Sequence, residues 1–330
     1  MNILVTGGTG FLGERLAIRL GKLGHHVTAM GRNQEKGKEL VGKGIRFIYN
    51  DLSIKESTIE HCQGMDYIFH CAALSSPWGK YEDFYASNVI GTKNIIEGAM
   101  SARVERMIHV STPSIYFKNK ERLDVKEEDA LPKKFINHYA ETKFLAEKEV
   151  DEAFKNGLPV ITIRPRAIFG PGDTSIIPRL IKVNREGFVP VFNENVTIDL
   201  TYVENVVDAL LLCMDSPEKT LGQKYNISNS EKVNLHQVLH VLFDELGERL
   251  RVKKINVATA NIAAKLLKWH SHLFKNGQEP KITNYSITIL SKSQTINIEK
   301  AKRELGYVPK VSIQEGIEYF SQWWKEEEHD

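Results

Sequence analysis

The sequence predicts an α/β fold in which helices cover both faces of a doubly wound parallel sheet. Two observations support this prediction. Short apolar strands alternate with segments of helical periodicity through the first half of the chain, and a glycine-rich turn connects the first strand to the first helix. Strand, helix and strand in this order form a right-handed crossover between parallel strands. Repetition of the unit builds the open sheet.

The expected strands are short apolar runs separated by helical or turn-forming segments. They cover residues 3–5, 26–30, 45–49, 67–71, 107–110, 160–163 and 224–228. The first helix is expected from Phe11 to Leu23, because leucines recur at helical spacing within it, and another contains Val206 to Leu212. The turn at 170–173, Gly-Pro-Gly-Asp, marks the point where the regular alternation weakens.

Composition narrows the class of protein. The 330 residues carry a formal net charge of +2 with no basic run, so we expect no nucleic-acid partner. Cys62, Cys71 and Cys213 lack metal-ligand spacing, which indicates reduced thiols in a cytoplasmic protein and no metal site. A strand at residues 3–5 leaves no room for a signal peptide, and no apolar stretch approaches the roughly 20 residues of a membrane span.

The glycine-rich turn indicates a dinucleotide site. Gly7, Gly10 and Gly13 lie between strand and helix, and Phe11 and Leu12 begin the helix. Glycines permit the tight turn and let the backbone approach a pyrophosphate, while the helix N-terminus supplies N–H donors and a positive dipole. We therefore expect these five residues to bind the cofactor.

The end of the second strand favours NADP(H) over NAD(H). An NAD site usually offers a carboxylate there to the ribose 2′-hydroxyl, but this chain has Gly31 followed by Arg32, which can bind a 2′-phosphate. The other expected cofactor contacts follow the third and fourth strands. They are Asp51 and Leu52 near the adenine, and Ala72 and Ala73, whose small side chains let the backbone pass the cofactor.

Two domains are expected. Residues 1–172 together with about 198–228 form the dinucleotide-binding domain, and about 173–197 together with 229–330 form a smaller substrate-binding lobe.

A second motif indicates proton transfer. Tyr139 and Lys143 are four positions apart and share a helix face, where the ammonium group is expected to lower the pKa of the phenol towards neutrality. Thr112 follows the fifth strand at the edge where ligands bind in open α/β sheets, so it can orient a substrate oxygen towards Tyr139. Ser111 is the alternative to Thr112. Asn88 is either a proton-relay residue or an ordinary residue of a helix surface.

Taken together, these motifs resemble the extended short-chain dehydrogenase/reductase superfamily, which includes the NAD-dependent epimerases and dehydratases. The shared segments are 6–13, 51–52, 72–73, 111–116, 139–143, 164–173, 201–209 and 301–307. The resemblance implies a Rossmann fold, catalytic roles for Thr112, Tyr139 and Lys143, and a nicotinamide-side contact from Pro165. It also implies that Tyr139 and Lys143 touch the cofactor and that two helices can form a homodimer.

The resemblance leaves the reaction to be decided among its branches. Sugar-nucleotide enzymes of the superfamily would be expected to have an arginine shortly before Thr201 and an Arg-x-Gly-Asp element near 290–295, and this chain has neither. Segments 76–79 and 292–298 resemble the 3β-hydroxysteroid dehydrogenase-like bacterial reductases, including the β-keto-acid reductase of long-chain olefin biosynthesis. We therefore expect an NADP(H)-dependent oxidoreductase that interconverts a secondary alcohol and a ketone on an apolar β-keto acyl, β-hydroxy acyl or steroid-like substrate.

Two alternatives stay open: an NAD-retaining sugar-nucleotide epimerase or dehydratase, and a non-catalytic dinucleotide-sensing protein. The segment 258–274 is broadly apolar. Packing against the rest of the chain or a dimer partner, a mouth for an apolar substrate, and contact with a membrane surface would each explain it.

Overall fold

The computed structural model describes residues 1–274 and 283–329, with side chains described up to residue 267 and from 283 to 327. Its centre is a seven-stranded sheet in the order β12-β7-β5-β4-β1-β2-β3, and every pairing is parallel. The strands are β1 (Asn2–Thr6), β2 (His26–Gly31), β3 (Arg46–Tyr49), β4 (Tyr67–His70), β5 (Arg106–Val110), β7 (Val160–Pro165) and β12 (Lys224–Ile227). This confirms the predicted doubly wound α/β sheet.

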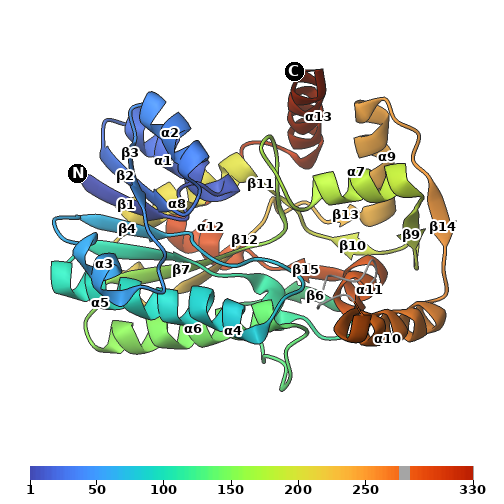
Figure 1. The fold of residues 1–330 in the computed structure, drawn as a ribbon, viewed down its shortest axis with the longest axis horizontal. Helices are drawn as coiled ribbons and strands as arrows, with labels where there is room; N and C mark the ends of the chain where they lie inside the picture. The colour runs from blue at the N-terminus through green and yellow to red at the C-terminus, as the bar shows by residue number, and fades with distance from the viewer. Residues whose placement is uncertain (275–282, 330) are drawn as a thin grey trace.

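Helices cover both faces of this sheet (Figure 1). One face carries α1 (Phe11–Lys22), α2 (Gln34–Gly42), α8 (Val203–Asp215) and α12 (Glu299–Leu305). The other carries α3 (Lys55–Glu60), α4 (Tyr81–Phe84), the π-helix η1 (Tyr85–Ile90), α5 (Gly91–Ala102) and α6 (His138–Lys155). Two apolar cores result because each strand presents alternate side chains to the two layers: Leu16 and Val206 belong to one core, Ile95 and Val150 to the other.

The smaller lobe is built around a four-stranded sheet in the order β13-β10-β15-β6. Its strands are β6 (Arg122–Val125), β10 (Thr197–Ile198), β13 (Val233–Asn234) and β15 (Gln294–Ile296). Short parallel pairs are formed by β8 (Ile168–Phe169) with β11 (Thr201–Tyr202), and by β9 (Val189–Val191) with β14 (Val252–Lys254). The helices of this lobe are α7 (Ile177–Glu186), α9 (Leu235–Leu246), α10 (Val257–Phe274), α11 (Asn284–Ser291) and α13 (Ile313–His329). Two short 3-10 turns lie next to the central sheet: η2 (Pro113–Tyr116) follows β5, and η3 (Glu218–Thr220) precedes β12.

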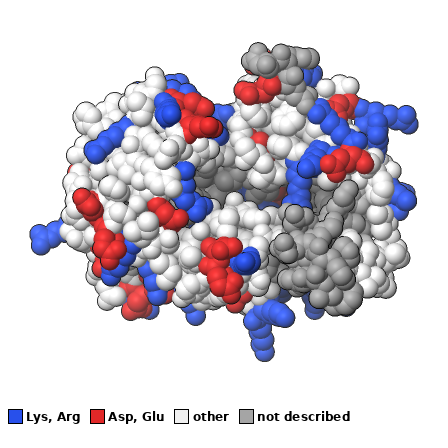
Figure 2. Space-filling model, viewed as in Figure 1, with Lys and Arg blue, Asp and Glu red and all other residues white. Residues whose placement is uncertain are grey.

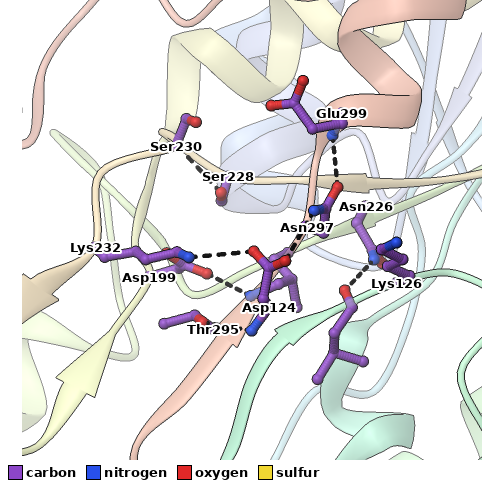
Figure 3. A network of polar contacts seen from close by, with 12 residues as sticks. Asp124, Lys126, Asp199, Asn226, Ser228, Ser230, Lys232, Thr295, Asn297 and Glu299 are labelled. Carbon is purple, nitrogen blue, oxygen red and sulfur yellow. Dashed lines mark hydrogen bonds and ion pairs between the residues drawn. The ribbon is translucent and has the colours of Figure 1, made fainter.

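A polar network ties β6, from the first half of the chain, to this lobe (Figure 3). The Asp124 backbone N–H donates to the Thr295 hydroxyl at 2.8 Å, and the Asp124 carboxylate binds Lys232 and Asn297 at 3.2 and 3.1 Å. Asp199 accepts the Ile296 N–H at 2.6 Å, and burial raises the pKa of Asp199 to about 6. The second sheet is therefore joined by segments far apart in sequence, and the domain boundaries stay a prediction.

A buried ion pair joins β7 to α6. Arg164 and Glu147 side chains are 3% and 2% exposed, and Arg164 donates to both carboxylate oxygens, from Nε at 2.8 Å and from Nη2 at 2.5 Å. The guanidinium also donates to the Tyr116 hydroxyl, which donates to Asn226 at 3.1 Å. Although burial opposes its charge, the Arg164 cation keeps the pKa of Glu147 below its ordinary value.

No helix in the described part of the chain is long and apolar enough to cross a membrane.

We predict that Glu147→Gln destabilises the protein by about 3 to 5 kcal/mol, because it leaves the buried Arg164 charge without its counter-charge. Urea unfolding at neutral pH measures this free energy. Glu152→Gln is the matched control, since the Glu152 pair with Lys155 is exposed and contributes about 0.5 kcal/mol or less. Equal stability of the two variants would contradict the role assigned to the buried pair.

Candidate functional site

Most of the expected site residues follow the carboxyl ends of β1, β2, β3, β4, β5 and β7, which meet at one edge of the parallel sheet, whereas Tyr139 and Lys143 lie in α6. Figure 2 shows a hollow between this part of the molecule and the lobe that carries α7 and α9, with basic side chains on both sides of it. The carboxyl edge of an open α/β sheet is where ligands bind.

The glycine turn after β1 forms a close-fitting cradle. Gly7 has φ +66°, and a Cβ there would lie 2.8 Å from Cα of Ala72. The Gly10 N–H donates to the Gly7 carbonyl at 2.9 Å, and a Cβ on Gly13 would collide with that carbonyl. No side chain caps the start of α1 at Gly10, so the backbone donors of the first helical turn remain available to an anion. The cradle thus fits a dinucleotide pyrophosphate.

The adenosine end of the expected site lies beyond β2. Arg32 Nη1 is 3.5 Å from a carboxylate oxygen of Asp51, and both side chains are exposed, at 59% and 38%. Hydrogen bonds from Ser53 keep the pKa of Asp51 low. A Cβ on Gly31 would collide with the Thr9 side chain, so close packing also requires glycine at this position. Gly31 is consequently weaker evidence for NADP than the sequence alone suggested.

Thr112 and Tyr139 face each other. Tyr139 lies in the first turn of α6, whose N-cap Asn137 accepts the Ala140 N–H at 2.9 Å. The side chain of Thr112, three positions after His109 of β5, hydrogen-bonds to the Tyr139 phenol and also accepts the Ser114 N–H at 3.1 Å. A hydroxyl pair is therefore positioned above the end of β5.

Lys143 is held beneath this pair. Its side chain is fully buried, and Nζ donates to the Val110 carbonyl at 2.7 Å and lies 3.2 Å from Nε2 of His109. Burial lowers the pKa of Lys143 to about 8.

The expected lowering of the Tyr139 pKa is wrong for the chain alone. Burial raises the pKa of Tyr139 to about 12, and the Thr112 hydrogen bond opposes this only in part. Lys143 directs its ammonium group at a backbone carbonyl and an imidazole and not at the phenol. Tyr139 is consequently a neutral proton donor in this state.

The two alternatives left open by the sequence are placed differently from Thr112. Ser111 lies beside the Glu147 carboxylate and is one of the groups that lower the pKa of Glu147. Ser111 is therefore associated with the buried ion pair and is separate from the hydroxyl pair. Asn88 is buried in η1 and is not a residue of a helix surface. It accepts the Leu74 N–H at 2.8 Å and donates to the Thr142 hydroxyl at 3.0 Å, so it fixes the loop after β4 against α6.

Two buried histidines beneath the site were not expected from the sequence. His70 and His109 stack with ring centroids 5.6 Å apart, and burial lowers the pKa of both, so they are neutral. Thr6 and Thr92 hydroxyls lie 2.8 and 2.9 Å from the two nitrogens of His70. Both histidines occur within otherwise apolar strand segments. A polar residue in such a segment is the one sequence signal that could have indicated these buried hydrogen bonds beneath the site.

Tyr285 of α11 and Arg166 are two further residues near the site that were not expected from the sequence. Tyr285 hydrogen-bonds to Ser114 and is close enough to Tyr139 and Arg166 to affect their ionisation. Arg166 directly follows Pro165 at the end of an apolar strand segment. An arginine in such a buried segment is a feature of the sequence that could have indicated a functional residue. Tyr285 carries no local motif, because only the fold brings it to the site.

Residues 3–228 match the sequence model of a protein family that is described as the NAD dependent epimerase/dehydratase family. Among its relatives, the 2-alkyl-3-oxoalkanoate reductase of Stenotrophomonas maltophilia is 32% identical over 323 residues, covering 96% of this chain and 97% of the relative. The human sterol-4-alpha-carboxylate 3-dehydrogenase, decarboxylating, is 31% identical, covering 95% and 86%. The UDP-glucuronic acid 4-epimerase of Bacillus cereus, solved with NAD, has a similar fold, with a TM-score of 0.79 at 22% identity and 99% coverage of both chains.

The chain belongs to the NAD dependent epimerase/dehydratase family of extended short-chain dehydrogenases/reductases. Its relatives confirm the predicted 3β-hydroxysteroid dehydrogenase-like branch. It is an enzyme that uses a nicotinamide dinucleotide to interconvert a ketone and an alcohol, as the sequence predicted.

We predict that kcat/KM for ketone reduction falls as pH rises through about 8. Burial depresses the pKa of Lys143 to about this value, so the ammonium form is present below it and is lost above it. Steady-state rates between about pH 6 and pH 10 test this. A flat profile across that range would show that the charge on Lys143 does not matter.

Proposed function

We propose that this enzyme reduces a ketone on an apolar substrate with NADPH and catalyses the reverse oxidation with NADP⁺. The observation that carries the proposal is the pairing of the Thr112 and Tyr139 hydroxyls at the same sheet edge as the glycine cradle. An oxygen that accepts hydrogen bonds from both groups would be held for reduction at its carbon.

The cofactor supplies the chemistry of hydride transfer to and from the substrate carbon. Gly7, Gly10 and Gly13 would hold its pyrophosphate against the α1 N-terminus, and Pro165 would lie against its nicotinamide. Phe11, Leu12, Ala72 and Ala73 would line the same channel, with Asp51 and Leu52 at its adenine end.

The protein's own residues handle the proton. Tyr139, which is neutral because burial raises its pKa, donates its phenolic proton to the substrate oxygen as that oxygen gains negative charge. Thr112 donates a hydrogen bond to the same oxygen and fixes its direction. Lys143 would stabilise the resulting phenolate through its positive charge, and its ammonium group would hold the nicotinamide ribose when the cofactor is bound. In the oxidation these proton movements reverse.

The preference for NADP(H) rests on Arg32. Its guanidinium is exposed, and its ion pair with Asp51 is long at 3.5 Å and easily exchanged for a 2′-phosphate. Asp51 is at the same time a carboxylate near that position, where it disfavours the additional negative charge. The bidentate contact of Arg32 with phosphate is the stronger effect in this proposal.

An apolar β-keto acyl, β-hydroxy acyl or steroid-like substrate is supported by the relatives, whose names specify a 2-alkyl-3-oxoalkanoate and a sterol carboxylate. The lobe offers apolar surface for such a substrate. Ile262, Leu266 and Leu267 of α10 are 62%, 63% and 38% exposed, whereas Ala260 and Ala264 of the same helix are buried. Trp269, Leu273 and Phe274, which contributed to the apolar prediction, lie outside the described side chains.

The exposed face of α10 also supports weak contact with a membrane surface, since apolar side chains of an amphipathic helix insert into that interface. A homodimer through two helices and a cytoplasmic location remain part of the proposal. The three described cysteines are free thiols, which fits that location.

We expect Tyr139→Phe to lower kcat for ketone reduction by about 100- to 10,000-fold, because no group then donates the proton. Thr112→Val should cost about 100-fold through loss of one donor to the substrate oxygen. Consumption of NADPH with β-keto acids, hydroxysteroids and aromatic ketones provides the assay, and Ser111→Ala is the control for Thr112. Wild-type turnover in Tyr139→Phe would exclude the mechanism. Net cofactor consumption separates the enzyme from a bound-NAD epimerase and from a dinucleotide sensor.

We expect Arg32→Ala to raise KM for NADPH by about 10-fold or more while changing KM for NADH much less, since only NADPH carries the 2′-phosphate. Initial rates at varied concentrations of each cofactor measure the two constants. An equal effect on both cofactors would remove the argument for NADP.

A further inference from the structure

Arg166 is a buried cation without an ion pair. It directly follows β7 and is 6% exposed, and its backbone N–H donates to the Ile227 carbonyl at 2.9 Å. Its guanidinium donates to the Gln294 side-chain oxygen at 3.3 Å and lies over the Phe117 ring, 4.3 Å from the centroid. Both partners are neutral, and no carboxylate of the described residues forms an ion pair with Arg166. Its positive charge is therefore not balanced by any direct contact.

The contrast with Arg164 shows that the fold does not require a buried arginine in this segment to lack a carboxylate partner. Arg164, two positions earlier and equally buried, has the Glu147 carboxylate in bidentate contact. Asp199 is the carboxylate whose charge acts on Arg166, but no ion pair between the two is present in the described part of the chain, and Asp199 Oδ2 accepts the Ile296 N–H instead. Asp199 thus offsets the charge only in part. A buried charge left in this state lowers stability, so its counter-charge is expected from outside the chain.

Two buried hydrogen-bond donors lie at the contact between Arg166 and Gln294. Nε of Arg166 and Nε2 of Gln294 are buried and have no hydrogen-bond partner among the residues that the structure describes. Buried donors of this kind are rare in folded proteins, and a bound ligand is one of the few things that explains them.

Tyr285 connects Arg166 to the hydroxyl pair. Thr112 hydrogen-bonds to both Tyr139 and the Ser114 N–H, and the Ser114 side chain hydrogen-bonds to Tyr285. The positive charge of Arg166 acts on Tyr285, and so does that of Arg179 of α7. The Tyr285 hydroxyl, which is linked to the hydroxyl pair through Ser114, therefore lies within the influence of two cations, in a protein whose overall charge is nearly neutral.

We propose that Arg166, together with Gln294 and Tyr285, recognises a carboxylate that the substrate carries close to the carbon undergoing reduction. A guanidinium group binds a carboxylate through two parallel hydrogen bonds, and the tyrosine hydroxyl can donate a third. The inference rests on the proposed function, and it narrows the substrate from apolar ketones in general to free β-keto acids and their β-hydroxy acid products. An alcohol without the carboxylate would leave these donors unpaired, and a thioester or ester would lack the charge.

The test compares two stable alcohols that differ only in the carboxylate: β-hydroxydodecanoate and its decarboxylated counterpart, methyl nonyl carbinol. Each is oxidised with NADP⁺ by wild type, Arg166→Met, Tyr285→Phe and Arg303→Gln. The measured quantity is the ratio of kcat/KM for the acid to that for the carbinol. Arg303 is the matched control, because it is an exposed arginine of α12 that pairs with Glu304.

Wild type should prefer the acid, and Arg166→Met should lower the ratio by about 10- to 100-fold through loss of a charged hydrogen-bonding partner. Tyr285→Phe should lower it by about 3- to 10-fold, and Arg303→Gln should leave it unchanged. Thermal unfolding supplies the second readout. Arg166→Met should melt at the wild-type temperature or higher, because methionine removes the uncompensated buried charge.

A ratio in Arg166→Met within about twofold of wild type would overturn the proposal, and a lower melting temperature with an unchanged ratio would assign Arg166 to the fold. Binding of dodecanoate and dodecanol to the NADP⁺-loaded enzyme, measured by calorimetry, separates this inference from the proposed function. If wild type oxidises neither alcohol, the proposed function fails. In that event, weaker dodecanoate binding by Arg166→Met supports the anion site, and equal binding overturns it.

Discussion

The parallel register of β1, β4 and β5 is the constraint on which the site depends. Thr6 pairs with His70 and His70 with His109, and the Thr6 hydroxyl and the stacked imidazoles occupy this row beneath the edge of the sheet. The residues that follow these strands therefore reach the same level: the glycine cradle after β1, Ala72 after β4, and Thr112 after β5. A register shift of one residue in any strand would turn its side chains to the opposite layer and separate the cradle from the hydroxyl pair.

Three of the buried cations in the described part of the chain, Arg164, Lys143 and Arg166, have partners of different kinds. Arg164 is matched by Glu147 and holds β7 to α6, so it serves stability. Within the described part of the chain, Lys143 has a carbonyl and a neutral imidazole as its hydrogen-bond partners, and burial lowers its pKa to about 8. Arg166 contacts an amide and an aromatic ring there. Arg106, at the start of β5, also lacks a carboxylate partner among the described residues, but its guanidinium donates to the Cys213 and Met214 carbonyls and the Ser216 hydroxyl. Lys143 and Arg166 lie at the expected catalytic and substrate ends of the site, where ligands can supply the missing counter-charge.

The sequence predicted what is encoded locally. Strand runs, the glycine turn and the Tyr139 and Lys143 spacing each reflect a short-range rule, and the expected strands correspond to the seven strands of the central sheet. It could not predict Tyr285, which lies on a helix more than a hundred residues away in sequence from Tyr139 and reaches the site only through tertiary packing. The direction of the Tyr139 pKa shift was also wrong, because spacing reveals a shared helix face but not the burial of the phenol or the stronger acceptors available to Lys143.

The central claim is that this site moves a hydride between a nicotinamide and a substrate carbon while Tyr139 supplies the proton. The most direct measurement uses NADPH deuterated at the transferring position of the nicotinamide with a β-keto acid, followed by mass spectrometry of the product. The account predicts one deuterium on the new carbinol carbon in the wild-type product, with almost no product formed by Tyr139→Phe. Unlabelled product, or labelled product formed equally well by Tyr139→Phe, would contradict it.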